Sequence, residues 1–81
     1  MVELYVSRAE AGAVERAVRL TRGAAAQMTR LGTPVQLLRS IYAAEDEVCF
    51  FLYVAESIEA VREAATATGR PFEHVAEVVE A

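Results

Sequence analysis

Cysteine and histidine each occur once in this sequence, as Cys49 and His74, and both side chains are capable of nucleophilic or metal-binding chemistry. Cys49 lies within an apolar run, "EVCFFLYVA". A reactive thiol needs a nearby base or cation that favours the thiolate, and no sequence neighbour of Cys49 supplies one. The pattern favours a buried, unreactive thiol over a nucleophile or a soft metal ligand.

The candidates for a metal site are His74, Glu77 and Glu3. Imidazole and carboxylate groups bind divalent metals, but a site needs three or four converging donors. His74 and Glu77 have no recognised ligand spacing, so a histidine in a surface loop is the favoured interpretation. If the last strand of the fold pairs with the first, Glu77 and Glu3 could lie near Tyr5.

Charged residues form two local groups. Glu45, Asp46 and Glu47 form an acidic cluster that indicates a solvated turn, which would also block edge-to-edge strand pairing; weak cation binding is the alternative. Four of the eight arginines fall within residues 16–30, but the net charge is −4 and there is no recognition motif. The sequence therefore argues against nucleic-acid binding.

The length of 81 residues predicts a single domain over residues 1–81. A lone cysteine excludes a disulfide within the chain and predicts a reducing, cytoplasmic setting. No apolar run approaches the roughly 20 residues that span a bilayer, so we expect no membrane insertion.

Hydrophobic periodicity and turn residues predict six elements. Alternating or continuous apolar runs indicate strands, and three- to four-residue spacing indicates helices. Ser57 is positioned to cap the second helix, and Gly69 to end it. The expected strands are 2–8, 35–44, 47–55 and 75–80, and the expected helices are 11–31 and 58–68.

This β-α-β-β-α-β order predicts an α+β, ferredoxin-like fold, in which a four-stranded antiparallel sheet has two helices on one face. If Val2, Leu4 and Val6 face the helices, Tyr5 faces away. For the third strand we expect Val48, Phe50, Leu52 and Val54 toward the helices, and the intervening residues outward. All three tyrosines could then share the outer face, and the predicted ligand-binding or interface residues are Tyr5, Tyr42, Cys49, Phe51 and Tyr53.

An apolar outer face indicates an interface or a ligand groove, and predicts a homodimer built as a dimeric α+β barrel. The alternative is a monomer whose tyrosines form an ordinary half-exposed surface.

The run from Ser40 to Val78, "SIYAAEDEVCFFLYVAESIEAVREAATATGRPFEHVAEV", resembles a bacterial family of domains of unknown function, number 4242. The resemblance implies a small ferredoxin-like protein, and some members are described as nickel-binding homodimers. It therefore implies nickel or another divalent metal as the cofactor. The chain departs from the family at three potential ligand positions, where it has Ser7, Val54 and Ala64.

Three functions follow as hypotheses. The first is a non-enzymatic binding protein that holds a small ligand or a divalent metal between two sheets. The second is a cofactor-independent enzyme of the monooxygenase or isomerase type, with Tyr5, Tyr53, Glu77 and His74 as acid–base candidates. The third is a structural module that serves a larger partner.

Overall fold

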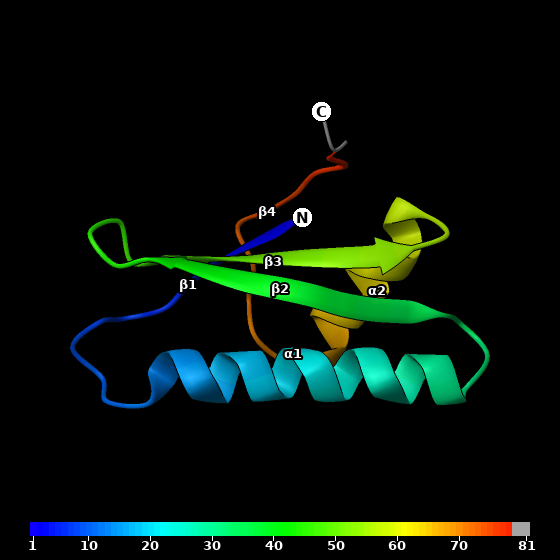
Figure 1. Ribbon diagram of the computed structural model, residues 1–81, viewed down its shortest axis with the longest axis horizontal. Coiled ribbons are helices and arrows are strands. Elements are labelled where there is room, and N and C mark those ends of the chain that lie inside the picture. The colour runs from blue at the N-terminus through cyan, green and yellow to red at the C-terminus, as the bar shows by residue number, and fades with distance from the viewer. Residues whose placement is uncertain (79–81) are drawn as a thin grey trace.

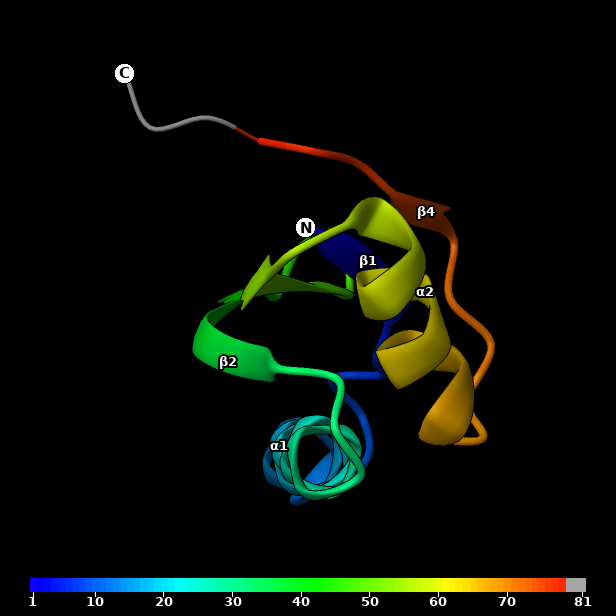
Figure 2. The same cartoon turned by 90° about the vertical axis from the view of Figure 1, so that its right-hand side faces the viewer.

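The computed structural model describes residues 1–78, in which a four-stranded antiparallel sheet has both helices on one face (Figures 1 and 2). The strands lie side by side in the order β2-β3-β1-β4, so β1 and β3 are central. This arrangement confirms the predicted ferredoxin-like fold class. Along the chain the elements are β1 (Val2–Tyr5), α1 (Ala13–Arg30), β2 (Val35–Ala43), β3 (Val48–Ala55), α2 (Ile58–Ala67) and β4 (His74–Val75).

The helix ends follow the predicted signals. The Ser57 hydroxyl oxygen accepts a hydrogen bond from the Ala60 N–H at 3.2 Å and caps α2. Beyond its C-terminus, Gly69 has a left-handed φ of 76°, which glycine adopts at low steric cost. Helix α1 runs through Gly23 without a break.

Thr29 joins the end of α1 to the start of β2. Its Oγ1 atom lies 3.1 Å from the Val35 N–H, which donates to it, and 2.9 Å from the Val35 carbonyl oxygen. The same atom lies 3.0 Å from the Ala25 carbonyl oxygen. One side chain thus holds the strand against the last turn of the helix.

The core fills the space between the sheet and the helices. The helices contribute mostly alanines to it, including Ala17 and Ala64, both fully buried. Because alanine is short, the helices can pack close to the strands, and the larger core side chains come from the sheet. These residues, in the strands or directly after β1, are Val2, Leu4, Val6, Leu37, Cys49 and Phe51.

The predicted orientation of β3 is wrong. In β1 and β3, Val2 lies opposite Phe51 and Leu4 lies opposite Cys49, and directly opposed residues share a face of the sheet. Cys49 and Phe51 therefore face the helices, where they are 0% and 1% exposed. Both sets of β3 side chains are apolar, so alternation could not identify the inner set; pairing with β1 determines it.

The prediction that the three tyrosines share the outer face is also wrong. Tyr53 lies opposite Leu37, and Tyr42 lies opposite Cys49, so both belong to the helix side. The Tyr42 hydroxyl donates to the Val6 carbonyl oxygen at 2.6 Å. Tyr5 alone faces outward.

A bulge interrupts β2. Leu37 pairs with Tyr53 and Arg39 with Leu52, so one extra residue, Leu38, is inserted between these pairs. The bulge shifts the alternation by one residue. As a result Leu37 is buried beneath the sheet, whereas Ile41, four residues later, is exposed on the outer face.

The last strand is shorter than predicted. β4 comprises only His74–Val75, paired with β1. Beyond it, the Ala76 N–H donates to the Met1 carbonyl oxygen at 2.9 Å, and residues 77–78 are not in a strand. The rest of the predicted strand, residues 79–80, lies outside the described residues. Within residues 1–78, no helix is long and apolar enough to cross a membrane.

Candidate functional site: the outer face of the sheet

The face of the sheet opposite the helices carries a group of apolar side chains, here called the outer face. Figure 2 shows α1 and α2 together on one side of the strands and the C-terminal segment passing on the other. Tyr5, Leu38, Ile41 and Val54 are 53%, 56%, 49% and 53% exposed. With the partly buried residues of β3 that lie between them, the outer face comprises Tyr5, Leu38, Ile41, Val48, Phe50, Leu52 and Val54.

Charged groups border this apolar surface on both sides. Glu3 lies opposite Phe50 on one side and His74 on the other, which places this carboxylate and imidazole toward the β4 edge. Arg39 lies opposite Leu52, on the β2 edge. Acidic and basic groups thus lie on opposite sides of the apolar strip along β3.

The predicted metal ligands are only partly brought together. Glu3 and His74 are direct cross-strand neighbours. Glu77 instead lines a cleft of about 260 Å³ with Met1, Val54 and Glu56, beyond the other end of β1 from Tyr5. Among residues 1–78 there is no group of three or more His, Cys, Asp or Glu side chains that could hold a metal ion.

The buried thiol and phenols are not suited to chemistry near neutral pH. Burial raises the pKa of the Cys49 thiol, so the thiol form is favoured. Burial raises the pKa of Tyr53 to about 12, against the opposing effect of a hydrogen bond with Thr21. Desolvation, followed by the Glu47 carboxylate, raises the pKa of Tyr42.

The acid–base candidates for an enzyme do not converge at one place. Tyr5 and His74 lie on the outer side of the sheet. Tyr53 lies on the helix side and reaches the cleft that Glu77 lines. Of the four candidates, only Tyr53 and Glu77 share a cavity, and the raised pKa of Tyr53 keeps its phenol protonated.

Sequence reasoning missed the role of Glu47. Its carboxylate accepts the Arg8 N–H at 2.9 Å, and its carbonyl accepts the Val6 N–H at 2.8 Å. Glu47 also has a φ of 54°, which is unusual for a residue with a side chain. Glu47 is therefore a structural link between the hairpin and the residues that follow β1. The sequence signal that could have indicated this role is its position directly before β3.

The three positions where the chain departs from the family resemblance do not form one site. Val54 is exposed on the outer face, whereas Ala64 is fully buried between α2 and the sheet. Ser7 follows the end of β1 and accepts a hydrogen bond from the Ala9 N–H at 3.3 Å. The positions therefore lie on different sides of the sheet.

The fold and this surface define a small ferredoxin-like protein with an apolar, uncovered sheet face. A family model described as "Nickel responsive protein SCO4226-like" matches residues 4–78, and the chain belongs to this family. No curated protein and no solved structure matches the chain.

Proposed function

We propose that the chain is a nickel-responsive binding protein that works as a homodimer, with the outer faces of two copies packed together. The observation that carries this proposal is the apolar outer face, present in a chain whose family is described as nickel responsive. A contiguous apolar surface of this kind is unusual on a monomer. The resemblance to a family that includes nickel-binding homodimers also supports it.

The outer face has the composition that a symmetric interface needs. Burying a large apolar side chain contributes about 1.5–3 kcal/mol, and each copy would bury several. Their sum can exceed the association cost, which is roughly 4–15 kcal/mol. A two-fold axis is the commonest symmetry for such pairs.

Nickel binding would depend on this assembly. One chain offers Glu3 and His74 as neighbours but no third ligand within residues 1–78. A second copy would add a second pair, giving four donors, and imidazole is a suitable ligand for nickel. Residues 1–78 of a single chain do not provide a complete site.

The dimer is tested by Ile41→Glu, which places a carboxylate in the proposed interface without touching the core. Sedimentation equilibrium at about 100 μM should give a dimer for the unmodified chain, and a monomer for the variant, because an unpaired buried charge is strongly destabilising. Arg22→Glu, on the exposed surface of α1, is the matched control and should remain dimeric. An unmodified chain that sediments as a monomer would overturn the proposal.

Phe51→Glu is not a useful interface variant. Phe51 belongs to the core beneath the sheet, so a carboxylate there should unfold the chain instead of separating two folded copies.

Nickel binding is tested by equilibrium dialysis followed by elemental analysis. We expect one nickel ion per two chains, with affinity reduced at least about tenfold by His74→Ala or Glu3→Gln. Glu63→Gln, on the exposed side of α2, should bind as the unmodified chain does. If the monomeric Ile41→Glu variant binds nickel with undiminished affinity, the metal does not require the interface and this part of the proposal fails.

A further inference from the structure

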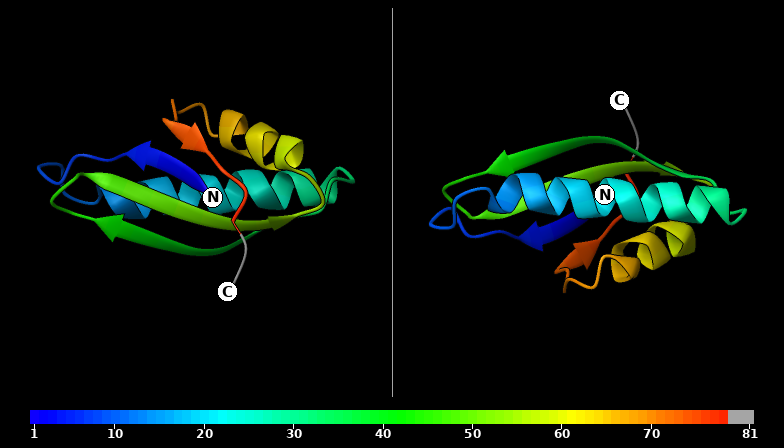
Figure 3. Two further views of the ribbon diagram at one scale, coloured as in Figure 1. Left: turned by 90° about the horizontal axis from the view of Figure 1, so that it is seen from above. Right: turned by 90° about the horizontal axis from the view of Figure 1, so that it is seen from below.

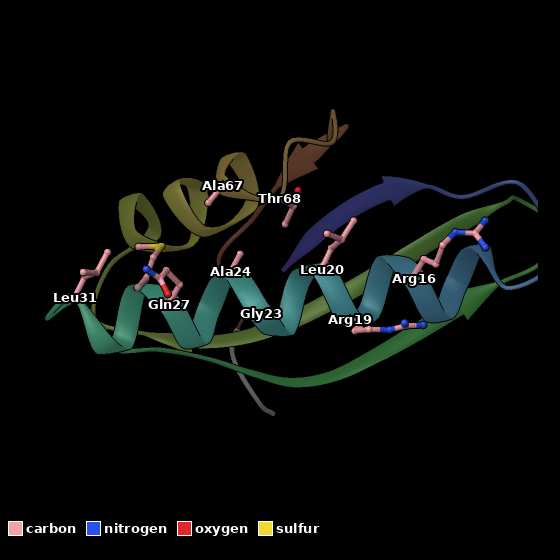
Figure 4. A pocket seen from close by; sticks show the side chains of 10 residues that line it. Arg16, Arg19, Leu20, Gly23, Ala24, Gln27, Leu31, Ala67 and Thr68 are labelled. Atoms are coloured by element: carbon pink, nitrogen blue, oxygen red, sulfur yellow. The ribbon is translucent and has the colours of Figure 1, made fainter.

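A second apolar surface lies between the two helices, away from the outer face. It is a groove of about 680 Å³, open to solvent, that follows α1 for much of its length (Figure 4). Its apolar lining includes Leu20, Ala24, Met28 and Leu31 from α1 and the turn that follows, and Ala67 from α2. Leu20 and Leu31 are 47% and 75% exposed, so this apolar surface has no partner within residues 1–78.

The groove exists because of helix length and small side chains. Helix α1 has 18 residues and α2 has 10, so α2 runs beside only part of α1 (Figure 3). Where the helices lie side by side, the groove is lined by Gly23, Ala24 and Ala67. A Cβ atom added at Gly23 would meet nothing within 4 Å, although this glycine costs about 1 kcal/mol against alanine in a helix.

The charges at the groove have one sign. Arg16 and Arg19 line it, and none of its lining residues is acidic, in a chain whose net charge is −4. The Arg16 guanidinium is held by the Glu10 carboxylate at 2.9 Å and the Ala11 carbonyl at 3.1 Å. Arg19 forms no ion pair within residues 1–78, so its guanidinium is available to a ligand.

We propose that this groove binds a linear aliphatic carboxylate, with the hydrocarbon chain along Leu20, Ala24 and Met28 and the carboxylate at Arg19. An apolar groove that follows a helix for much of its length fits an unbranched chain, and the guanidinium matches a carboxylate. The volume falls within the usual 300–1,000 Å³ of small-molecule sites. This site is separate from the outer face and does not depend on nickel binding.

The test is a calorimetric titration of the full chain with dodecanoate below its micelle concentration, with dodecylamine as the cationic counterpart. We expect saturable binding of dodecanoate in the micromolar range and much weaker binding of dodecylamine. Decanoate, which is two methylenes shorter, should bind up to about tenfold more weakly. No saturable binding of dodecanoate below 1 mM, or equal binding of the amine, would overturn the proposal.

Two pairs of variants locate the site. Ala67→Trp fills the groove from an exposed position on α2 and should abolish binding, whereas Ala26→Trp, on α1 outside the groove, should bind normally. Arg19→Gln should weaken binding about fivefold, and Arg22→Gln should leave it within about twofold. Circular dichroism confirms that each variant is folded. If Ala67→Trp binds dodecanoate normally, or if it changes the oligomeric state because another copy occupies the groove, the assignment is wrong.

Discussion

The two faces of β3 differ although both are apolar. Phe50 and Phe51 are adjacent in the sequence, yet Phe51 is buried under the helices and Phe50 lies on the outer face beside Glu3. The helix side has a complete set of intramolecular partners for its side chains. The outer face has apolar side chains that neither helix covers, and charged groups border it. A strand can therefore be apolar on both sides for two different reasons: one face builds the core, and the other forms the interface of the proposed dimer.

Polar groups on the two faces show the same contrast. On the helix side, the Tyr42 hydroxyl is hydrogen-bonded to the backbone, and no buried side-chain nitrogen or oxygen among residues 1–78 lacks a partner. On the outer side, Glu3, His74 and Arg39 carry or can carry charge at the borders of the apolar strip. Satisfied polar groups stabilise one conformation, whereas border charges select a partner and its orientation.

The largest expected difference in stability between the two faces comes from replacing Phe51 or Phe50, one at a time, by alanine. Phe51→Ala should lower the free energy of unfolding by about 3–5 kcal/mol, because it leaves a cavity in the core. Phe50→Ala should cost less than about 1.5 kcal/mol when both changes are made in the monomeric Ile41→Glu background. Urea denaturation followed by circular dichroism measures both values.

The Ile41→Glu background is necessary because, in a dimer, Phe50→Ala would also remove contacts between the two copies, and the measured loss would include that contribution. Equal losses for the two variants would show that the outer phenylalanine is also part of the folding core, and the contrast between the faces would not hold.

Alkaline pH should weaken the helix side. Because the pKa of Tyr53 is raised to about 12 in the folded chain from an ordinary value of 10, the folded state retains a proton that the unfolded state loses between these values. The stabilisation is complete below pH 10 and is lost as the pH rises toward 12. Tyr53→Phe should therefore lose less stability between pH 9 and pH 11, measured by urea midpoints.

Tyr5→Phe is the matched control on the outer face and should follow the unmodified chain across this range. If both variants lose stability in parallel with the unmodified chain, ionisation of Tyr53 is not the cause of the alkaline loss.

The last comparison measures how accessible a thiol is on each face of β3, and its variants should change stability least. Cys49 should react with iodoacetamide only through opening of the fold, because its thiol is fully buried and its pKa is raised. Val54→Cys in a Cys49→Ala background should react at least about 100-fold faster at micromolar protein or below. Mass spectrometry gives both rates.

The same Val54→Cys thiol should become slower to react as the protein concentration rises, because the proposed dimer covers it. A rate that is independent of concentration, in a chain that sediments as a dimer, would place the interface elsewhere.

The sequence predicts the order of elements well because local signals are strong. Ser57 and Gly69 mark the two ends of α2 by physical effects that act within a few residues. The face of β3 could not be predicted, since every one of its eight residues is apolar, and only pairing with β1 decides between two equally apolar sets. The same holds for β2, where the extra residue at Leu38 reverses the alternation.

The outward orientation of Tyr5 could be predicted, because β1 alternates between apolar and polar residues. The pairing of β1 with β4 follows from the topology of the fold. Tyr42, Tyr53, Cys49 and Phe51 were misplaced because their position depends on strand register, a non-local property. The inter-helix groove was not predicted, although the expected helices 11–31 and 58–68 already differ in length, because its lining depends on how the two helices pack.

The Glu47 link has a practical consequence for protein engineering. Exposed turns between strands are the usual places for inserted tags, labels or fused domains, and the turn at residues 44–47 looks suitable by its charge. An insertion there would displace the carbonyl and carboxylate that hold the Val6 and Arg8 amides, and so would loosen the segment that follows β1 from a distant point in the sequence. A tag placed in this hairpin would report on a chain in which the end of β1 has lost this anchor.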